Sequence, residues 1–184
     1  MIVRNPVLPA VSWRQPARVA AVLAALALPL AACGGSSDDS ADYACPQPFT
    51  VQDAERLTHF KPGAGRDPRD IAYEATLVGA AAGCKLTKST VEVTLIVRIA
   101  ASAGPSVDPG RTAVPFFVRV IDSSGAIVQG QEFVSEMRLT SANPQAAVRE
   151  ELSLSLSRSV SYRIAVGLKP TPEELNYNRR GRQP

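Results

Sequence analysis

The fold class is decided by residues 91–99, which read VEVTLIVRI. Every odd-numbered position in this stretch is apolar, and most of the positions between them are polar or charged. A period of two residues is typical of a β-strand with one buried face. Residues 152–157, LSLSLS, show the same period with leucine and serine. They predict a second strand with one dry face and one wet face.

The same alternation recurs on both sides of these two strands. It is found in residues 71–77, 116–120, 133–139 and 162–168. The sequence Asp122-Ser123-Ser124-Gly125 predicts a hairpin turn into residues 126–128, and Gly130 indicates a break in the strand that follows. Several alternating strands between turn sequences predict a mainly β fold. We expect an antiparallel β-sandwich of immunoglobulin-like type with short flanking helices.

Two short helices are expected beside the sandwich. Thr50 followed three residues later by Asp53 resembles a helix N-cap, and it predicts a helix over residues 51–57. The sequence Thr171-Pro172-Glu173-Glu174 combines a capping box with proline at the first helical position. It predicts a second helix that ends at about Tyr177.

The N-terminal region has the pattern of a secretory signal. Basic residues at Arg4, Arg14 and Arg18 precede an apolar run over residues 19–30. That run is shorter than the ~20 apolar residues that a membrane-spanning helix needs. A basic region, a short apolar segment and small residues before a cleavage point indicate a signal peptide rather than a membrane span.

The end of this signal, Leu30-Ala31-Ala32-Cys33, resembles a bacterial lipobox. The resemblance implies that Cys33 is diacylated on sulfur, becomes the first residue after cleavage and is then acylated on its amine. Residues 1–32 are then a lipoprotein signal peptide. The polar run of residues 33–42 is expected to be a flexible tether, followed by the folded domain over residues 43–178.

The lipobox resemblance also implies a location. In enteric bacteria, aspartate directly after the acylated cysteine retains a lipoprotein at the inner membrane, and here that position is Gly34. We therefore expect a cell-envelope protein held by its lipid at the outer membrane and facing the periplasm.

The charge of the predicted mature chain gives no support for nucleic-acid binding. The chain has 20 basic and 17 acidic residues, and removing the three arginines of the signal leaves 20 − 3 = 17 basic residues. The net charge of the mature part is then zero, so the basic excess belongs to the signal. We expect no nucleic-acid partner.

The number of cysteines fits an exported protein. With Cys33 taken by lipid, Cys45 and Cys84 remain as a pair in an oxidising compartment. A disulfide between them would close a loop of roughly 40 residues and contribute about 4 kcal/mol on the chain-entropy model. The alternative is two unrelated buried thiols.

The residues available for catalysis are few. The chain has one histidine, His59, and no Gly-x-Ser-x-Gly motif. A zinc site would need several imidazole or thiolate ligands, and the acidic groups near Asp38 and Asp67 lack the spacing of a calcium loop. We therefore expect no enzyme activity, no metal site and no cofactor, and a structural or exposed role for His59.

The strongest candidate for a binding site is the loop predicted over residues 61–69. Glycines beside an arginine can present backbone amides and a guanidinium to an anion. The residues singled out for such a site are Gly63, Gly65, Arg66 and Asp67. Because the segment does not lead from a strand into a helix, it is neither a phosphate-binding loop nor a dinucleotide fingerprint. The alternative is a tight loop in which Arg66 or Arg69 pairs with Asp67, Asp70 or Glu74.

The end of the chain, residues 179–184, is expected to be a polar tail. Its arginines at positions 179, 180 and 182 could each add about 1 kcal/mol of attraction to anionic lipid near a membrane. A solvated C-terminus is the alternative.

A second resemblance covers most of the predicted domain. The chain is similar to small proteobacterial lipoproteins of unknown function over several short segments. These are Cys45-Pro46, Leu57-Thr58, Phe60, Pro62 to Asp67, Asp70, Tyr73-Glu74-Ala75, Cys84, Gly104-Pro105, Pro115 to Val118 and Glu174 to Arg179. This resemblance implies no activity and assigns no site residue.

Two functions remain open from the sequence. The first is a non-enzymatic, lipid-anchored adaptor or accessory subunit of an envelope complex, which binds a protein partner along its strand edges. The alternative is a periplasmic protein that binds a small molecule or a glycan. It would need an apolar pocket in which polar groups such as Arg66, Asp67 and Tyr73 converge.

Overall fold

The structure is a computed structural model that describes residues 43–63 and 65–181. The predicted signal peptide (residues 1–32), the lipidation site Cys33, the tether (residues 33–42) and the last three residues of the predicted tail lie outside this part of the chain.

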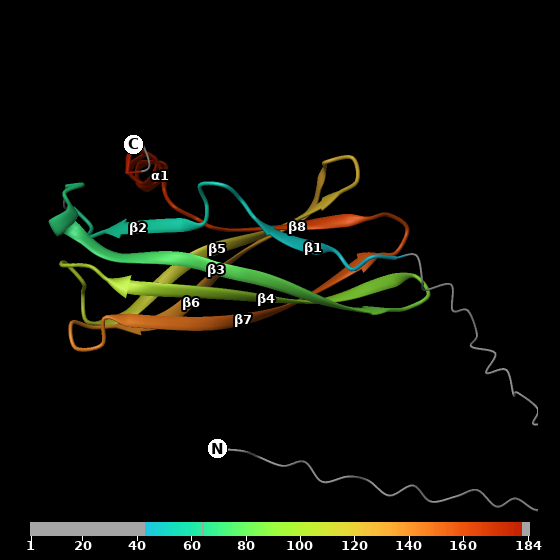
Figure 1. Cartoon of the computed structure of the whole chain (residues 1–184), viewed down its shortest axis with the longest axis horizontal. Helices are drawn as coiled ribbons and strands as arrows, with labels where there is room; N and C mark the ends of the chain where they lie inside the picture. Colours follow the sequence, from blue (N-terminus) through green and yellow to red (C-terminus); the bar gives the residue numbers. More distant parts are fainter. Residues whose placement is uncertain (1–42, 64, 182–184) are drawn as a thin grey trace, which may run out of the picture. The chain divides into compact units, whose positions relative to one another are not determined.

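Two four-stranded sheets face each other in the described domain (Figure 1). The first sheet has the order β1-β8-β5-β6 and the second the order β2-β3-β4-β7. The strands are β1 (Gln47–Thr50), β2 (Arg56–Phe60), β3 (Ile71–Leu86), β4 (Thr90–Ala103), β5 (Gly110–Asp122), β6 (Ile127–Leu139), β7 (Gln145–Ser157) and β8 (Tyr162–Leu168). A one-turn 3-10 helix (Pro68–Asp70) and the helix α1 (Pro172–Arg180) accompany them. The predicted mainly β, antiparallel β-sandwich is confirmed.

All neighbouring strands pair antiparallel except one pair. The short N-terminal strand β1 runs parallel to β8, with Gln47 opposite Arg163. Because consecutive strands β1 and β2 belong to different sheets, the chain crosses from one sheet to the other between Thr50 and Arg56.

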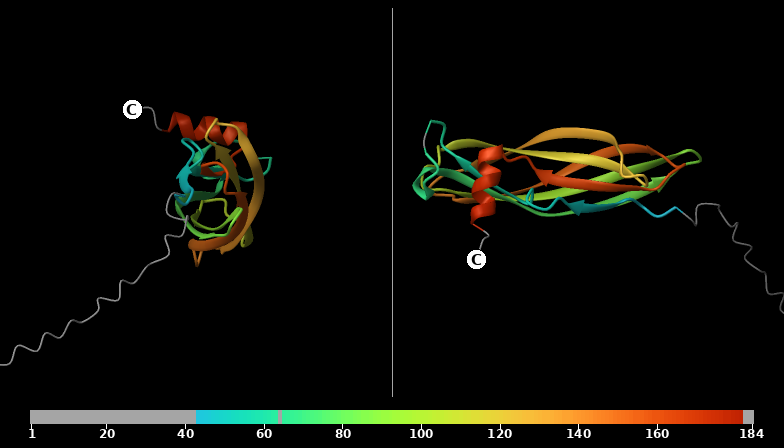
Figure 2. Two further views of the ribbon diagram at one scale, coloured as in Figure 1. Left: turned by 90° about the vertical axis from the view of Figure 1, so that its right-hand side faces the viewer. Right: turned by 90° about the horizontal axis from the view of Figure 1, so that it is seen from above.

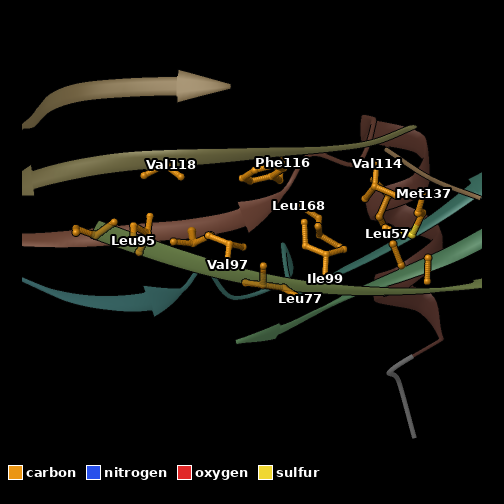
Figure 3. Close-up of a cluster of buried hydrophobic side chains, with 14 of the residues drawn as sticks. Leu57, Leu77, Leu95, Val97, Ile99, Val114, Phe116, Val118, Met137 and Leu168 are labelled. Atoms are coloured by element: carbon orange, nitrogen blue, oxygen red, sulfur yellow. The ribbon is translucent and has the colours of Figure 1, made fainter. Parts of the chain in front are cut away.

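The stretch that decided the fold class lies at the centre of the second sheet. It forms most of β4, which pairs with β3 on one side and β7 on the other. Its odd-numbered side chains, at Val91, Val93, Leu95, Val97 and Ile99, are almost completely buried. They pack against apolar side chains of the opposite sheet, such as Phe116 and Val118 (Figure 3). The alternating residues 152–157 form the end of β7, where Leu154 and Leu156 are buried.

The predicted helix over residues 51–57 is wrong. Val51 and Ala54 instead join the first sheet: the Val51 amide donates to Val166 O (3.0 Å), and the Leu168 amide donates to Ala54 O (2.6 Å). The Leu77 amide of the second sheet donates to Glu55 O (2.8 Å). The backbone of this segment therefore forms hydrogen bonds with both sheets. These bonds to strands outweigh the local preference for a helix that the N-cap pattern indicates.

The predicted break at Gly130 is also wrong, because β6 continues through it. Gly130 lies opposite Arg119 of β5, whose side chain crosses over it. A Cβ atom at position 130 would lie 2.8 Å from Cδ of Arg119. The glycine thus makes room for a neighbouring side chain and does not end the strand.

The predicted capping box on α1 is confirmed. The Thr171 side chain accepts from the Glu174 amide (3.3 Å), and the Glu174 carboxylate accepts from the Thr171 amide (2.8 Å). The helix extends beyond the expected end at Tyr177, because two later side chains hold it to the β1–β2 connection and to the first residue of β2. Asn178 donates to Arg56 O (3.1 Å), and Arg179 donates to the Asp53 carboxylate (3.0 Å). The first residues of the predicted polar tail therefore belong to α1.

The connections between the long strands lie at the two ends of the described domain (Figure 2). We call one the Tyr43 end, because the described chain begins there. It also holds the β3–β4, β5–β6 and β7–β8 turns. We call the other the α1 end. It holds α1, the connections β2–β3, β4–β5 and β6–β7, and the binding loop expected from the sequence.

Candidate functional site

The four loop residues singled out from the sequence do not converge on one site. Gly63 has a positive φ of +76°, which glycine adopts without strain. Arg66 extends to α1, where it pairs with Glu173 and lies 5.0 Å from the centre of the Phe60 ring. Gly63 and Arg66 line a hollow of about 450 Å³ beside the start of α1, whereas Gly65 and Asp67 do not.

Asp67 has a local structural role in this loop. It caps the 3-10 helix by accepting from the Arg69 amide (2.9 Å) and from Arg69 Nε (3.0 Å). These bonds from Arg69 lower the pKa of the Asp67 carboxyl. One of the ion pairs expected for a tight loop is therefore present, while Arg66 pairs outside the loop.

The most distinctive polar contact at the α1 end joins His59 of β2 to Glu174 of α1. Nδ1 of His59 lies 2.8 Å from Oε1 of Glu174. The glutamate is 5% exposed, whereas the histidine side chain is 41% exposed and accessible to solvent. Burial alone would raise the pKa of Glu174, but hydrogen bonds from His59 and from the Thr171 amide hold this pKa below its usual range.

Tyr73 extends this contact into the sandwich. Its ring stacks on the His59 ring with 4.8 Å between centres, and its hydroxyl donates to Ala113 O of β5 (2.7 Å). Burial is the main cause that raises the pKa of the Tyr73 phenol, and the nearby Glu174 carboxylate adds to it. Tyr73 thus joins β3 of one sheet to β5 of the other and remains a neutral hydrogen-bond donor at neutral pH.

A cleft of about 540 Å³ lies beside these three side chains. It exists because β8 is short. β8 ends at Leu168, opposite Phe116, and the Lys169 amide then donates to Pro115 O (2.9 Å) before the chain turns into α1. Among the described residues, no strand pairs with Gly110–Val114 of β5 on that side, although β6 pairs with this stretch on the other.

The walls of the cleft come from both sheets. β2 and β3 supply Leu57, His59 and Tyr73, and β5 supplies Arg111, Thr112, Ala113 and Pro115. Three ion pairs surround the opening, Arg111–Glu136 (2.6 Å), Lys61–Asp108 (3.7 Å) and Lys169–Glu132. The site is therefore an apolar slot with neutral and paired polar groups at its rim, as small-ligand and peptide sites commonly are.

Another hollow, of about 570 Å³, lies on the outer face of the second sheet. Its floor is made by small side chains such as Ala100, Ser102 and Ala147, and its charged residues are Arg56 and Glu74. No buried ionisable side chain points into it from the described part of the chain. On chemistry, the cleft beside His59 is the better candidate for a functional site.

Sequence reasoning missed the His59–Glu174 contact because the two residues are 115 positions apart. The capping box located Glu174, but nothing near His59 indicated a partner. The disulfide predicted between Cys45 and Cys84, by contrast, is confirmed, with 5.7 Å between the two Cα atoms. It joins the start of the described chain to the end of β3.

The described residues contain no group of three or more histidine, cysteine, aspartate or glutamate side chains that could hold a metal ion. In the same part of the chain, no helix has the length and apolar character needed to cross a bilayer. No family model, no curated protein and no solved structure matches this chain.

Proposed function

We propose that this protein is a lipid-anchored, non-enzymatic adaptor of the cell envelope that holds an extended segment of a partner protein in the cleft at its α1 end. The lipobox-like sequence at residues 30–33 supports the anchor, and the Cys45–Cys84 disulfide fits an oxidising compartment. Gly34 after the proposed lipidated cysteine supports an outer-membrane location, where the domain would face the periplasm.

One observation carries the adaptor role: no strand pairs with Gly110–Val114 of β5 on the side where β8 stops, and this stretch borders an apolar cleft. Ala113 O there accepts from the Tyr73 hydroxyl, so the backbone groups left for a partner strand are the Ala113 amide and those of Arg111. An extended peptide placed there would continue the position of β8 and add a strand to the first sheet. Strand addition satisfies backbone groups along a sheet edge and places alternate side chains in pockets. A glycan or a small metabolite would not supply such a ladder of backbone groups.

The free edge of β7 is a poorer acceptor for a partner strand. Glu150 of β7 is partly buried between the two sheets, where it accepts from the hydroxyl of Ser135 of β6 (2.6 Å). An inward-pointing charge on an edge strand discourages pairing with another chain. Of these two edges, the half-edge of β5 inside the cleft is the better acceptor.

Site-specific crosslinking in intact cells tests the adaptor role. A photoreactive residue at Ala113, in the cleft, is expected to capture one envelope protein through a short extended segment. The matched control is the same photoreactive residue at Ser153, an exposed position on β7. Equal capture at both positions, or none at Ala113, would contradict the proposal.

The second candidate function is binding of a small molecule in the same cleft. It is favoured by the convergence of His59, Glu174 and Tyr73 on one wall, which offers a donor and an acceptor beside apolar surface. If this reading is right, Ala113 captures no protein in cells. A cleft ligand from periplasmic extract should then raise the melting temperature of the wild type and not that of a Thr112→Trp variant, whose side chain fills the cleft.

A further inference from the structure

The exposed apolar side chains of the described domain are concentrated at one end. The large exposed ones are Val78, Ile127, Val128, Val134 and Val160. Ile127 and Val128 directly follow the β5–β6 turn, and Val160 lies in the β7–β8 turn. Both turns are at the Tyr43 end (Figure 2), so three of these five side chains share that end.

Basic side chains surround the point where the chain enters the same end. Lys85 follows Cys84, which the disulfide joins to Cys45 near the first described residue. Arg163 begins the pairing of β8 with β1, opposite Gln47, and lies 4.4 Å from the centre of the Phe49 ring. Both cations are therefore held next to the start of the folded chain.

Two more cations lie at the neighbouring turns. Lys88 is exposed in the β3–β4 turn. Arg158 of the β7–β8 connection packs against that turn: its amide donates to Ser89 O (2.9 Å), and its guanidinium donates to Thr87 O (3.2 Å). The two turns and their charges thus form one continuous surface.

Acidic side chains at these strand ends are already engaged. Glu92 accepts from Ser155 (2.6 Å) and Thr90 (3.2 Å). Asp122 accepts from Ser124 and from the Ala126 amide within its own turn (2.6 and 3.0 Å). In the described part of this end, the exposed cations Lys85, Lys88 and Arg163 therefore outnumber these two carboxylates.

We propose that the Tyr43 end is a membrane-contact surface that rests on an anionic phospholipid bilayer. Ile127, Val128 and Val160 enter the headgroup region, and Lys85, Lys88 and Arg163 contact lipid phosphates. This inference rests on the proposed lipid anchor. It goes beyond it, because it assigns an orientation in which the cleft at the α1 end points away from the bilayer.

The length of chain before Tyr43 supports this occupant. The ten residues from Cys33 to Asp42 precede the first described residue, and they extend at most roughly 35 Å. A tether this short keeps the Tyr43 end at a high effective concentration beside the membrane, so a contact that is weak in free solution suffices to orient the domain.

The competing occupant of the cations is the tether itself, which carries Asp38, Asp39 and Asp42. If the tether carboxylates bound Lys85, Lys88 and Arg163, these cations would be neutralised within the chain. The exposed aliphatic side chains distinguish the two occupants, because a bilayer covers them and a polar tether of glycine, serine and aspartate does not.

A single-tryptophan experiment tests the orientation. The only tryptophan of the chain is Trp13, so the chain from Gly34 onward has none, and it contains every described strand and helix. This chain, held by an N-terminal hexahistidine tag on vesicles that contain nickel-chelating lipid, receives a Val160→Trp reporter or, as the matched control, a Val78→Trp reporter in the middle of β3. The vesicles contain about one third phosphatidylglycerol and a brominated phosphatidylcholine that quenches nearby tryptophan.

We expect the Val160→Trp fluorescence to shift to the blue and to be quenched at least threefold more than that of Val78→Trp. Adding Lys88→Glu to the Val160→Trp chain should remove most of this difference, whereas Arg138→Glu, with the same charge change on β6, should leave it. Equal quenching of the two reporters, or none at either, overturns the proposal, and the latter is the result expected if the tether occupies the cations. Because the tag replaces the acyl anchor, the outcome is independent of Cys33 lipidation and of any partner.

Discussion

At the scale of single residues, the His59–Glu174 contact links the cleft to the start of α1. Glu174 is buried, and its carboxylate accepts hydrogen bonds from His59 and from the Thr171 amide. Its carboxylate is therefore the ionised group with the closest contacts to the rest of the described fold. Its neighbour Glu173 pairs with Arg66 at the surface instead. The two adjacent glutamates therefore provide a variant and its control.

Replacing Glu174 by glutamine should destabilise the protein by about 1–2 kcal/mol at pH 7, because hydrogen bonds to an ionised partner contribute about that much more than neutral ones. Glu173→Gln should cost less than about 1 kcal/mol, as for exposed ion pairs. The measurement is urea unfolding of both variants and the wild type. Equal losses would show that Glu174 is no more important than its exposed neighbour.

The same contact predicts a pH dependence. The pKa of Glu174 is lower in the folded chain than its ordinary value of about 4.3. The unfolded chain therefore binds the proton first, and the stability that the carboxylate contributes is present above that value and is lost as pH falls through the folded pKa. The stability gap between the wild type and Glu174→Gln should narrow between about pH 5 and pH 3. A gap that stays constant would contradict the assigned contact.

Gly104 is required for a close backbone approach. A Cβ atom there would lie 2.2 Å from Ile71 O, a main-chain atom that cannot move aside. Gly104→Ala should therefore destabilise by at least about 2 kcal/mol, as steric overlap in packed regions does. Gly79→Ala is the control, since nothing lies within 4 Å of its added Cβ atom, and it should be neutral or stabilising by about 0.5 kcal/mol. Thermal and urea unfolding of both variants measure the difference.

At the scale of elements, the alternation of apolar residues located the strands well, because each long strand has one buried face. β4 and β7 follow directly from residues 91–99 and 152–157. The connection between β1 and β2 could not be predicted in this way. Its backbone groups pair with Val166, Leu168 and Leu77, residues far away in the sequence, and a local N-cap pattern carries no information about them.

The second half of β3 also escaped prediction. Residues 78–86 contain three alanines and two glycines and have no clear alternation, yet they pair with β4 through Leu86. Pairing with β4 therefore makes these residues a strand, although their own side chains show no strand pattern. Likewise, the cleft arises from where β8 stops relative to β5, which is a property of two strands and not of either sequence segment.

The disulfide holds the first element in place. Cys45 lies two residues before β1, the shortest strand, and Cys84 lies near the end of β3. Changing both cysteines to serine should cost about 2–4 kcal/mol in urea unfolding, in keeping with a closed loop of roughly 40 residues. Hydrogen exchange should show lost protection at Phe49 and Thr50 of β1, with β4 unchanged. Uniform loss across both strands would mean that the bridge does not hold β1 in particular.

At the scale of the whole molecule, the domain has two chemically different ends. The Tyr43 end carries exposed aliphatic and basic side chains, and the α1 end carries the cleft. β4 alone, with 14 residues, extends about 45 Å between them. On the proposed orientation, the anchor and the partner-binding cleft act at opposite ends of one rigid sandwich.

Membrane association should depend on one atom, the sulfur of Cys33. In cell fractionation, a Cys33→Ser variant should move from the membrane to the soluble periplasmic fraction or accumulate with its leader uncut. Cys45→Ser, which also removes one cysteine, is the control, and the protein that remains folded should stay at the membrane. If Cys33→Ser fractionates like the wild type, a lipid at this position is not what holds the protein.

Mass spectrometry of the N-terminal peptide of the protein purified in detergent tests the central claim most directly. The account predicts a peptide that begins at Cys33 and carries a diacylglycerol on the sulfur and a fatty acyl group on the amine. A peptide that retains residues from the leader, or that begins elsewhere with Cys33 unmodified or absent, would contradict the anchor and with it the assigned compartment.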